Sequence, residues 1–384
     1  MSIYYFDHAA SAPRRDEVAD AMAPFQHGIV GNPSGTHRAA RAARRAVEEA
    51  RDDIAAFVGA PARGVIFTGG GTESCALALG GVAYQRRAAP QGLVVSAVEH
   101  HAVLENAERL ARDVPQCRVS FVGVDHDGVV DLDQLAACLD ATTSVVSVMT
   151  ANNETGVLQP LDALARVVRT HAPHAVLHTD AVAAAPWLDL SVATADMDLI
   201  SLCAHKLGGP VNAGVLVQRQ KIALTPMVLG GGQEQGIRGG TVDVAAVVGL
   251  AAAVRLAAAE RDEAVRHVTQ LRSRMVAALT ALSDVEITAP HAARLPGHVH
   301  VTIGGVVSDE VLFLLDQDGI CASAASSCSS GAAVASHVLA AMGMSPDRAR
   351  GAIRFTMGAE TTADDVDYVV AAVERAVSRL RSTS

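Results

Sequence analysis

The stretch DLISLCAHKLGGP, residues 198–210, places a lysine where an apolar run meets a turn. Its apolar first half predicts a buried strand, and the Gly-Gly-Pro sequence ends that strand. An ammonium group at such a point loses hydration free energy unless it is deprotonated, covalently bound or in contact with water. Lys206 is therefore either an amine committed to chemistry or a side chain that extends from the strand end into solvent.

Similar apolar runs recur from residue 64 to residue 219, and longer helical patterns separate several of them. Besides the opening stretch, the predicted strands are GVIFTGG (64–70), LVVSAVEH (93–100), CRVSFVGV (117–124), SVVSVMTAN (144–152), AVLHTDAV (175–182) and AGVLVQR (213–219). The predicted helices include TESCALALGGVAYQRR (72–87), HAVLENAERLARD (101–113) and LDALARVVRTHA (161–172). This alternation predicts βαβ units and a mostly parallel sheet, so the expected fold class is α/β.

After residue 256 the pattern changes to that of a smaller α+β unit. A long charged helix over residues 255–284 precedes two short strands, VEITAP (285–290) and HVHVTIG (298–304). Two more helices follow, and then a final helix that mixes acidic and basic residues. The expected domains are a large α/β domain, 14–256, and a small α+β domain, 1–13 plus 257–384.

The composition is that of a globular protein and excludes two classes of partner. Half of the 384 residues are hydrophobic and 19% are charged. A net charge of −10 disfavours contact with a phosphate backbone, so nucleic acid is not expected as a partner. The N-terminus lacks a basic region followed by an apolar core, and the apolar helical stretch Val244–Val254 is interrupted at Arg255. We therefore expect no signal peptide, no membrane span and a cytoplasmic location.

The six cysteines are scattered, without a CxxC pair or a metal-ligand spacing with histidine. They predict reduced thiols of a cytosolic protein and no metal site. Cys328 differs from the others because the stretch SAASSCSSGAAVASHVL (323–339) is rich in serine, glycine and alanine, which predicts an exposed thiol in a loop. The alternative is a small buried cysteine, which we expect for Cys321 in its strand-like context.

Polar residues follow several predicted strands, at the edge where ligands bind in parallel α/β sheets. The stretch TGGGTES (68–74) joins a strand to a helix, so its glycines and the free N–H groups of the helix suit an anion. It matches neither a Walker loop nor GxGxxG. The alternative is an ordinary tight turn in which Thr72 or Ser74 caps the helix.

Three further strand ends carry polar residues. VEHHAV holds His100 and His101, for which surface hydrogen bonding is the alternative to catalysis. The Asn-Asn-Glu run 152–154 either faces a ligand or forms an Asx turn. Asp180 follows the apolar run AVLH, where a carboxylate needs a cationic partner or several donors. An anion cup, a strand-end aspartate and a strand-end lysine together predict pyridoxal phosphate, with Lys206 at its aldehyde and Asp180 at its ring nitrogen.

Motifs across nearly the whole chain resemble those of the NifS/IscS-like cysteine desulfurases, which are fold type I, class V aminotransferase-type pyridoxal-phosphate enzymes. YFDHAASAP (5–13) is similar to the family's YLDHAATTP, and GNPSGTH (31–37) is similar to its GNPSSxH. TGGGTES, EHHAV, NNETG, HTDAV, AHKLGGP, IRGGT and AIRFTMG follow in the family's order. The resemblance implies a mostly parallel large domain and a small α+β domain that carries a sulfur-accepting cysteine.

The resemblance implies a role for each matching residue at the cofactor. Lys206 would bind the cofactor covalently, Asp180 would pair with its ring nitrogen, and His100 would stack on the ring and move protons. Thr241 would reach the phosphate bound in the neighbouring subunit, which implies a homodimer with shared sites. The implied cofactor contacts are Gly71, Thr72, His100, Asn153, Asp180, Cys203, His205, Lys206 and Thr241.

The implied substrate is L-cysteine, whose carboxylate would be bound by Asn153 and Arg354. Lys206 would remove the α-proton, and the Cys328 thiolate would attack the substrate sulfur. The products would be L-alanine and a persulfide on Cys328, in a loop that resembles the family's longer-loop group. An iron–sulfur scaffold, a tRNA thiolation enzyme and a natural-product sulfur carrier are the alternatives for the protein that accepts the sulfur.

Several positions depart from the family's pattern. Ala183 stands where members usually carry a glutamine that donates to the cofactor's phenolic oxygen, and Cys203 replaces a phosphate-binding serine. Val211 replaces the lysine usual after the Gly-Gly-Pro turn, and AVASH (333–337) replaces LEPSH. Two lost hydrogen bonds predict weaker cofactor retention, by about 1–3 kcal/mol. The alternative functions are a selenocysteine lyase, a C–S lyase that releases sulfide, an epimerase, and a non-catalytic sulfur-trafficking protein of the same fold.

Overall fold

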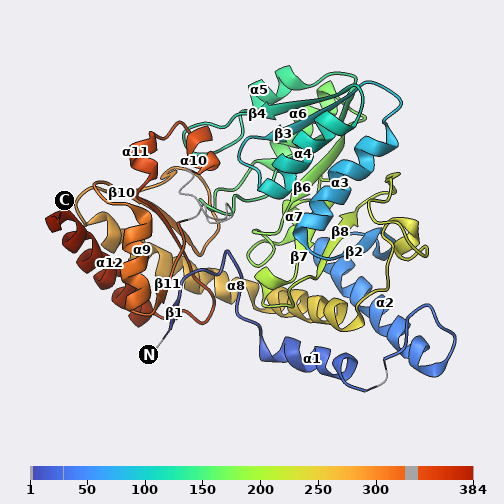
Figure 1. The fold of residues 1–384 in the computed structure, drawn as a ribbon, viewed down its shortest axis with the longest axis horizontal. Helices are drawn as coiled ribbons and strands as arrows, with labels where there is room; N and C mark the ends of the chain where they lie inside the picture. The colour runs from blue at the N-terminus through green and yellow to red at the C-terminus, as the bar shows by residue number, and fades with distance from the viewer. Residues whose placement is uncertain (1–2, 29, 325–335, 384) are drawn as a thin grey trace.

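The computed structural model describes residues 3–28, 30–324 and 336–383, so Cys328 lies outside the described residues. Two lobes stand next to each other, and the long helix α8, Val244–Thr280, runs along both of them (Figure 1). The N-terminal strand β1, Tyr4–Tyr5, and the C-terminal helix α12, Ala363–Thr383, both belong to the smaller lobe.

The large lobe is built on a seven-stranded sheet with the order β2-β8-β7-β6-β5-β3-β4. Neighbouring strands from β7 to β4 are parallel, whereas β8 is antiparallel to both β2 and β7. Every predicted strand is present, because runs of valine, isoleucine and leucine suit positions that are buried on both faces of a sheet. The strands are β2 Val65–Thr68, β3 Gln91–Ser96, β4 Cys117–Val122, β5 Thr143–Ser147, β6 Val176–Asp180, β7 Leu199–Cys203 and β8 Gly214–Gln218.

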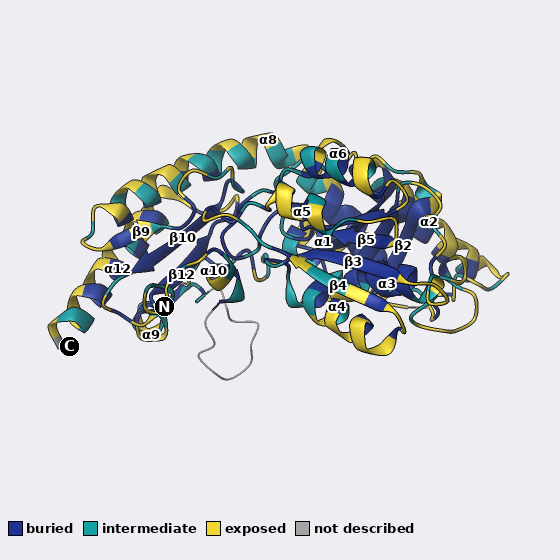
Figure 2. Cartoon of the chain, turned by 90° about the horizontal axis from the view of Figure 1, so that it is seen from above, coloured by how far each residue is buried: buried dark blue, intermediate teal, exposed yellow. Residues whose placement is uncertain are grey.

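Helices cover both faces of this sheet. Alternate strand residues divide between two apolar clusters, so Val65 and Phe67 of β2 belong to the cluster with α2, α6 and α8, whereas Ile66 belongs to the cluster with α3 and α4. Figure 2 shows most strands as a buried layer next to helices whose outer faces are exposed, with the edge strand β4 partly exposed. The helices are α1 Asp16–Gln26, α2 Arg38–Val58, α3 Gly71–Gln85, α4 His101–Asp113, α5 Leu132–Cys138, α6 Leu161–His171 and α7 Leu190–Ala193.

The small lobe contains a three-stranded antiparallel sheet in the order β12-β10-β9. Its core also takes residues from the second half of α8 and from α12, and Phe6 near the N-terminus is buried in it. β1 pairs in parallel with β11, Ile320–Cys321, so the predicted strand context of Cys321 is confirmed, but this cysteine is half-buried rather than a core residue. The other elements are β9 Val285–Ile287, β10 His298–Ile303, α9 Ser308–Gln317, α10 His337–Ala341, α11 Pro346–Ala349 and β12 Ala352–Thr356.

Helix α8 differs from the sequence prediction, which began the long helix at residue 255. The structure continues the apolar stretch Val244–Val254 into the charged segment as one helix. The first half is buried on nearly all sides by the large lobe, so it has no amphipathic period, whereas the second half shows one because it lies at the surface. Arg255 lies within the helix and does not end it. Its guanidinium forms an ion pair with Asp53.

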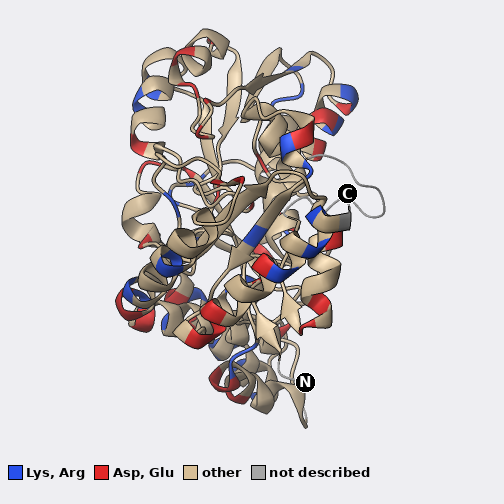
Figure 3. Ribbon diagram, turned by 90° about the vertical axis from the view of Figure 1, so that its left-hand side faces the viewer, with Lys and Arg blue, Asp and Glu red and all other residues tan. Residues whose placement is uncertain are grey.

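Surface charge and helix length agree with a globular chain. Among residues 3–28, 30–324 and 336–383, no helix is long and apolar enough to cross a membrane. Acidic and basic residues are interspersed along the outer helices, and the sheet layer carries few of either (Figure 3).

Candidate active site

The carboxyl ends of β3, β5, β6 and β7 meet the start of α3 at one edge of the large sheet, facing the small lobe. A cavity with an empty volume of about 840–910 Å³ lies on each side of the lysine at this edge, and the larger one holds the polar residues. All of the predicted site residues that the structure describes line this larger cavity, except Thr241. Those that line it are Gly71, Thr72, His100, Asn153, Asp180, Cys203, His205, Lys206 and Arg354.

Lys206 lies in a short 3-10 turn, His205–Leu207, that follows β7 directly. Gly208 ends this turn with a φ of 73°, a conformation that favours glycine. The lysine is half-buried and lines the cavity rather than extending away from the sheet into open solvent. The chain has one other lysine, Lys221, which is exposed. Lys206 is thus the amine that the fold presents to the cavity.

Asp180, at the end of β6, is nearly buried, with 7% of its surface exposed. One carboxylate oxygen accepts the backbone N–H of Val182 at 2.9 Å, and the other lies 3.7 Å from the Cys75 thiol. A carboxylate offers about four acceptor positions, so these two neutral donors leave room for a cationic one. The structure therefore puts the aspartate at the cavity wall in a setting that suits the protonated ring nitrogen expected from the sequence.

The first turn of α3 forms the anion cup. Gly70 occupies the N-cap position with a φ of 145°, no side chain caps the helix, and Ser74 instead donates its hydroxyl to the Gly70 carbonyl at 3.0 Å. The alternative of a helix capped by Thr72 or Ser74 is therefore wrong, and the first N–H groups of α3 are left to a ligand. A side chain at Gly71 would meet the Val182 side chain at 2.8 Å, so glycine is required there.

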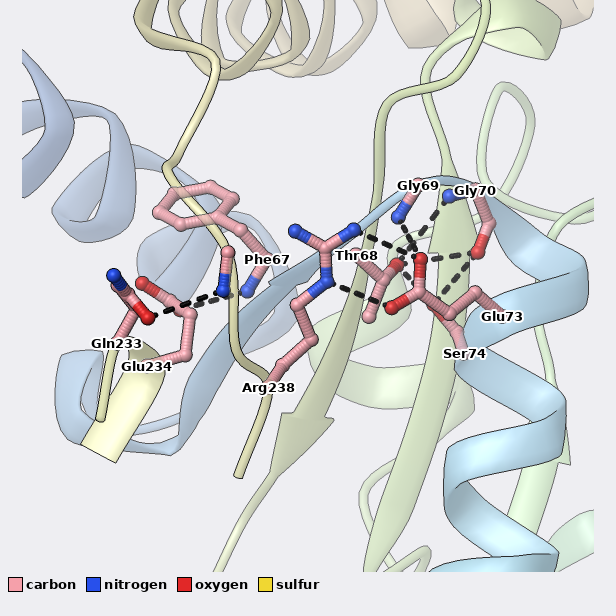
Figure 4. Close-up of polar contacts among 10 residues, drawn as sticks. Phe67, Thr68, Gly69, Gly70, Glu73, Ser74, Gln233, Glu234 and Arg238 are labelled. Atoms are coloured by element: carbon pink, nitrogen blue, oxygen red, sulfur yellow. Dashed lines mark hydrogen bonds and ion pairs between the residues drawn. The ribbon is translucent and has the colours of Figure 1, made fainter. Parts of the chain in front are cut away.

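An ion pair fixes the loop beneath this cup. Glu73 accepts the backbone N–H of Gly69 at 2.6 Å and the Arg238 guanidinium at 2.8 Å (Figure 4). Arg238 comes from the IRGGT stretch, which joins the loop before α8 to the cup. Thr241, three residues later, is exposed and does not line the cavity of its own chain, so its role stays a prediction that requires a second subunit.

His100 is the N-cap residue of α4, and its ring lines the cavity. Its Nδ1 accepts the backbone N–H of Ala102 at 3.0 Å, which assigns the ring proton of the neutral form to Nε2. Burial lowers the pKa of His100, and the neighbouring Lys206 adds to this effect. The imidazole is therefore neutral at physiological pH, and the interpretation as an ordinary surface histidine does not apply.

The two asparagines of the Asn-Asn-Glu run have different roles. Asn152 is buried and accepts the backbone N–H groups of Glu154 and Thr155, each at 2.9 Å, so the predicted Asx turn is present. That turn directs Asn153 to the cavity, where its carbonyl accepts Arg354 at 2.9 Å. Arg354, from β12, also pairs with Asp7 at 2.7 Å, and its buried Nε has no hydrogen-bond partner among the described residues. These contacts use two of the five guanidinium N–H groups, and Arg354 lines the cavity, so donors remain for an anion there.

Two positions reflect the departures from the family pattern. The Cys203 thiol lies 3.8 Å from Nε2 of His205, and burial raises its pKa to about 11, so it is a neutral, weak donor. Ala183 lines the cavity with a methyl group and offers no hydrogen bond.

Two buried carboxyl groups lie next to predicted site residues: the sequence interpretation missed Glu99 and included Glu154 only as part of the Asn-Asn-Glu run. The Glu99 carboxylate accepts a hydrogen bond from the backbone N–H of Met149, and the Glu99 backbone carbonyl accepts one from Nε2 of His337 at 2.9 Å. Burial, together with the nearby Asp180, raises the pKa of the Glu99 carboxyl group well above the usual range. Glu154 accepts the Ser336 hydroxyl at 2.5 Å, and burial raises its pKa to about 7. The Glu154 carboxylate and the Glu99 backbone carbonyl thus connect strand-end loops of the cavity to the start of α10, whereas the Glu99 carboxylate bonds within the large lobe. Their only sequence signal is a position next to His100 and Asn153.

Comparisons with known proteins agree with this geometry. Residues 4–369 match the family model described as aminotransferase class-V. The chain is 37% identical over 381 residues to the cysteine desulfurase IscS of Dictyoglomus turgidum, covering 99% of this chain and 96% of that protein. A solved NifS-like protein superposes with a TM-score of 0.92 at 33% identity, over 99% of this chain and all of that one. A structure of SspA in complex with cysteine matches with a TM-score of 0.79 at 29% identity, over 93% of this chain and 99% of that one. The chain therefore belongs to the aminotransferase class-V family, and within it to the IscS/NifS-like cysteine desulfurases.

Proposed function

We propose that this cysteine desulfurase uses pyridoxal phosphate to take sulfur from L-cysteine, releases L-alanine, and passes the sulfur through a persulfide on Cys328 to a protein acceptor. One observation carries the cofactor assignment: Lys206, Asp180 and the uncapped start of α3 line a single cavity. An amine, an acid and an anion cup are the three groups that an aldehyde, a ring nitrogen and a phosphate require.

The residues present fit this cofactor. Lys206 would hold its aldehyde, and Asp180, with acceptor capacity to spare, would keep its ring nitrogen protonated. Gly71, Thr72 and His205 would hold its phosphate at the helix start, where N–H groups and the helix dipole favour an anion. When bound, pyridoxal phosphate supplies an electron-withdrawing ring that takes up negative charge from the α-carbon of the amino acid.

The chain's own residues then position the substrate and move its protons. Arg354, held in place by Asp7 and the backbone carbonyl of Asn153, would bind the carboxylate of L-cysteine with N–H groups that these two contacts leave over. Once the amine of the substrate has displaced it, Lys206 would take the proton from the α-carbon of the substrate. His100, neutral and with its ring proton on Nε2, would stack on the cofactor ring and relay a proton.

Sulfur leaves by nucleophilic attack. The Cys328 thiolate would form a bond to the substrate sulfur while the bond from that sulfur to the β-carbon breaks. The electron pair stays with the carbon, which is protonated to give the methyl group of L-alanine. The transferred sulfur and its proton remain on Cys328 as a persulfide, so neither an oxidant nor a reductant is consumed in this step.

A variant of Cys328 distinguishes a desulfurase from a lyase, because only a desulfurase needs this thiol to take up the sulfur. Cys328→Ser is expected to abolish persulfide formation while the absorbance of the bound cofactor still changes on addition of L-cysteine. Cys138→Ser, at a half-buried cysteine remote from the cavity, is the control and should behave as wild type. Unimpaired sulfide release by Cys328→Ser would instead indicate a lyase, and a protein that binds no cofactor at all would indicate a non-catalytic role.

A homodimer is also part of the proposal. Thr241 is exposed, and so are the adjacent apolar residues Val228 and Leu229 in the same loop region, which a second subunit would cover. Light scattering of the holoprotein should give twice the mass of the chain. A mixture of Lys206→Ala and Thr241→Ala proteins should then form hybrid sites, because each intact residue would come from a different subunit.

The sulfur acceptor is proposed only as a class, namely a protein that carries a nucleophilic thiol. An iron–sulfur scaffold, a tRNA thiolation enzyme and a natural-product sulfur carrier all meet this description. Labelled sulfur loaded onto the enzyme from L-cysteine should move to the true acceptor and should not move to a cysteine-free variant of it.

A further inference from the structure

Three polar side chains lie on the sheet face that α3 covers, at most 1% exposed and behind an apolar start to each strand. They are Ser147 of β5, His178 of β6 and Ser201 of β7. Val145, Val176 and Leu199, two residues before each of them, belong to the apolar cluster of α3 and α4. Residues two apart share a face of a strand, so the three polar groups lie on that same face. Buried polar groups cost free energy unless they are hydrogen-bonded.

The three side chains bond to one another. The Ser147 hydroxyl lies 2.8 Å from Nδ1 of His178, and Nε2 of the same ring lies 2.9 Å from the Ser201 hydroxyl. Ser147 and His178 are paired residues of neighbouring strands, which accounts for the first contact. Burial lowers the pKa of His178 to about 3, so the ring is neutral and presents one N–H donor and one acceptor.

Cys75 connects these residues to the proposed cofactor site. It comes from α3, is fully buried, and its thiol lies 3.7 Å from the Asp180 carboxylate. Asp180 and Ser201 are paired residues of β6 and β7. Burial and the charge of Asp180 raise the pKa of the Cys75 thiol well above its usual range, while a hydrogen bond with the Ser201 hydroxyl opposes that shift. The thiol therefore keeps its proton and has one S–H group to donate.

The donors of this polar row (Ser147, His178, Ser201 and Cys75) all point toward Asp180. An ionised carboxylate only accepts, so the S–H of Cys75 is directed to Asp180. The sulfur then accepts the Ser201 O–H, and the Ser201 oxygen accepts Nε2–H of His178. Nδ1 is left to accept the Ser147 O–H. Aligned hydrogen bonds polarise one another in a low-dielectric interior, so the row stabilises negative charge at its Asp180 end.

A second buried acid shows what this stabilisation decides. Burial, together with the charge of Asp180, raises the pKa of Glu99, and two nearby buried carboxyl groups do not both ionise. Glu99 has the backbone N–H of Met149 on one oxygen and no partner among the described residues on the other. Asp180 has the backbone N–H of Val182 on one oxygen and Cys75 on the other. The additional donor favours Asp180 as the group that carries the charge.

We propose that Cys75, Ser201 and His178 are positioning residues for Asp180, which they hold ionised and oriented toward the ring nitrogen of the cofactor. The inference rests on the proposed function and deepens it. None of these three residues lines the cavity, so they would act on the ring nitrogen only through Asp180.

Titration of apoprotein with cofactors that have or lack a ring nitrogen tests the proposal. Cys75→Ala removes the donor nearest to Asp180 and should weaken binding of pyridoxal phosphate by about tenfold, the loss expected for one hydrogen bond to a charged group. Cys75→Ser keeps a donor and should retain wild-type affinity. A deaza analogue, in which a C–H group replaces the ring nitrogen, should show no such loss with Cys75→Ala, because it offers nothing for Asp180 to pair with.

A double substitution tests whether the polar row acts as one unit. Ser201→Ala should weaken binding of pyridoxal phosphate by about threefold, because it acts through the thiol. In the Cys75→Ala background, Ser201→Ala should have no further effect, since its connection to Asp180 is already lost. His178→Gln, which keeps a donor and an acceptor, should bind the cofactor more tightly than His178→Leu.

Matched controls come from buried positions at the amino ends of strands in the same sheet, away from Asp180. Ser144→Ala removes a hydroxyl of β5 that bonds to Gln91 and Gly92, and Cys117→Ala removes a buried thiol at the start of β4. Both should leave the affinity for pyridoxal phosphate unchanged. Thermal unfolding verifies that each variant is folded.

Three results would overturn the proposal. The first is wild-type or tighter binding of pyridoxal phosphate by Cys75→Ala, and the second is an equal loss for the deaza analogue, which would indicate a general distortion of the cavity. The third is additive losses for Cys75→Ala and Ser201→Ala. A wild-type protein that binds neither compound would instead overturn the proposed function and this inference with it, so the two failures are distinguishable.

Discussion

The two lobes contribute to the site in different ways. The large lobe supplies Lys206, Asp180 and His100 from the carboxyl ends of parallel strands or from the turns that follow them. The small lobe supplies Arg354 from within strand β12. In the proposed function, strand ends of the large lobe would hold the cofactor, whereas a strand of the small lobe would bind the substrate. Substitutions in each lobe should separate these two contributions.

The largest effect is expected at Asp180, in the large lobe. Asp180→Asn removes the negative charge opposite the proposed ring nitrogen and should lower L-alanine formation by about 100-fold, the upper range for one charge-assisted hydrogen bond. The rate should be measured at saturating pyridoxal phosphate, with Asp140→Asn, at an exposed aspartate far from the cavity, as the control. A wild-type rate for Asp180→Asn would contradict the proposed role of Asp180 opposite the ring nitrogen.

The next effect concerns the small lobe. Arg354→Lys keeps the charge but cannot span Asp7 and the Asn153 carbonyl while also reaching the substrate. We expect KM for L-cysteine to rise by roughly 10-fold or more, with little change in cofactor affinity. Arg348→Lys is the matched control, because Arg348 bonds to Thr302 and Asp284 on the same lobe and does not line the cavity. Equal losses of cofactor affinity and substrate affinity would contradict the division between the lobes.

A smaller gain is expected from Ala183→Gln, which restores a donor toward the cofactor. The apoprotein should bind pyridoxal phosphate about fivefold more tightly, as one neutral hydrogen bond of about 1 kcal/mol allows. Cys203→Ser, which replaces a neutral thiol by a hydroxyl, should add a comparable gain at the phosphate. Spectroscopic titration of apoprotein measures both, and affinities equal to wild type would show that these departures do not weaken the site.

The smallest effect is a pH dependence at the contact between the lobes. The pKa of Glu154 is raised to about 7 in the folded protein, so the folded state holds a proton that the unfolded chain releases. Its contribution to stability is therefore full below the ordinary glutamate pKa and is lost as pH rises through about 7. Between about pH 5 and about pH 8 the unfolding temperature should fall by a few degrees, and Glu154→Gln should reduce that fall. If the unfolding temperature of Glu154→Gln fell by the same amount over this pH range, groups other than Glu154 would be responsible for the fall.

Much of the large lobe could be predicted because the inner parallel strands β3, β5, β6 and β7 are buried on both faces and contain apolar runs, whereas the edge strand β4 is partly exposed. The same rule located Lys206, Asp180 and His100, because a polar residue directly after such a run lies at the ligand edge of the sheet. The sequence prediction failed where full burial, rather than the helical period, determined which residues are apolar. The apolar first half of α8 shows no amphipathic stripe, so its continuity with residues 255–280 was missed.

Contacts between segments that lie far apart in the sequence were the other feature that could not be predicted. Glu154 and Ser336 meet across the lobes at 2.5 Å, and no local pattern encodes that meeting. His298 looks like one of several alternating residues in HVHVTIG, and only the fold shows that its buried ring nitrogens have no hydrogen-bond partner among the described residues. Arg354 was identified through the family resemblance, since its strand offers no sign of a substrate contact.

The identity of the amine that holds the cofactor is the central claim, and the composition of this chain makes it simple to test. Lys206 and Lys221 are its only lysines. After borohydride reduction of the holoprotein and digestion, mass spectrometry should find the pyridoxyl mass on the peptide that contains Lys206 and on no peptide that contains Lys221. A pyridoxyl group on Lys221, or on neither lysine of a protein that shows cofactor absorbance, would contradict the account.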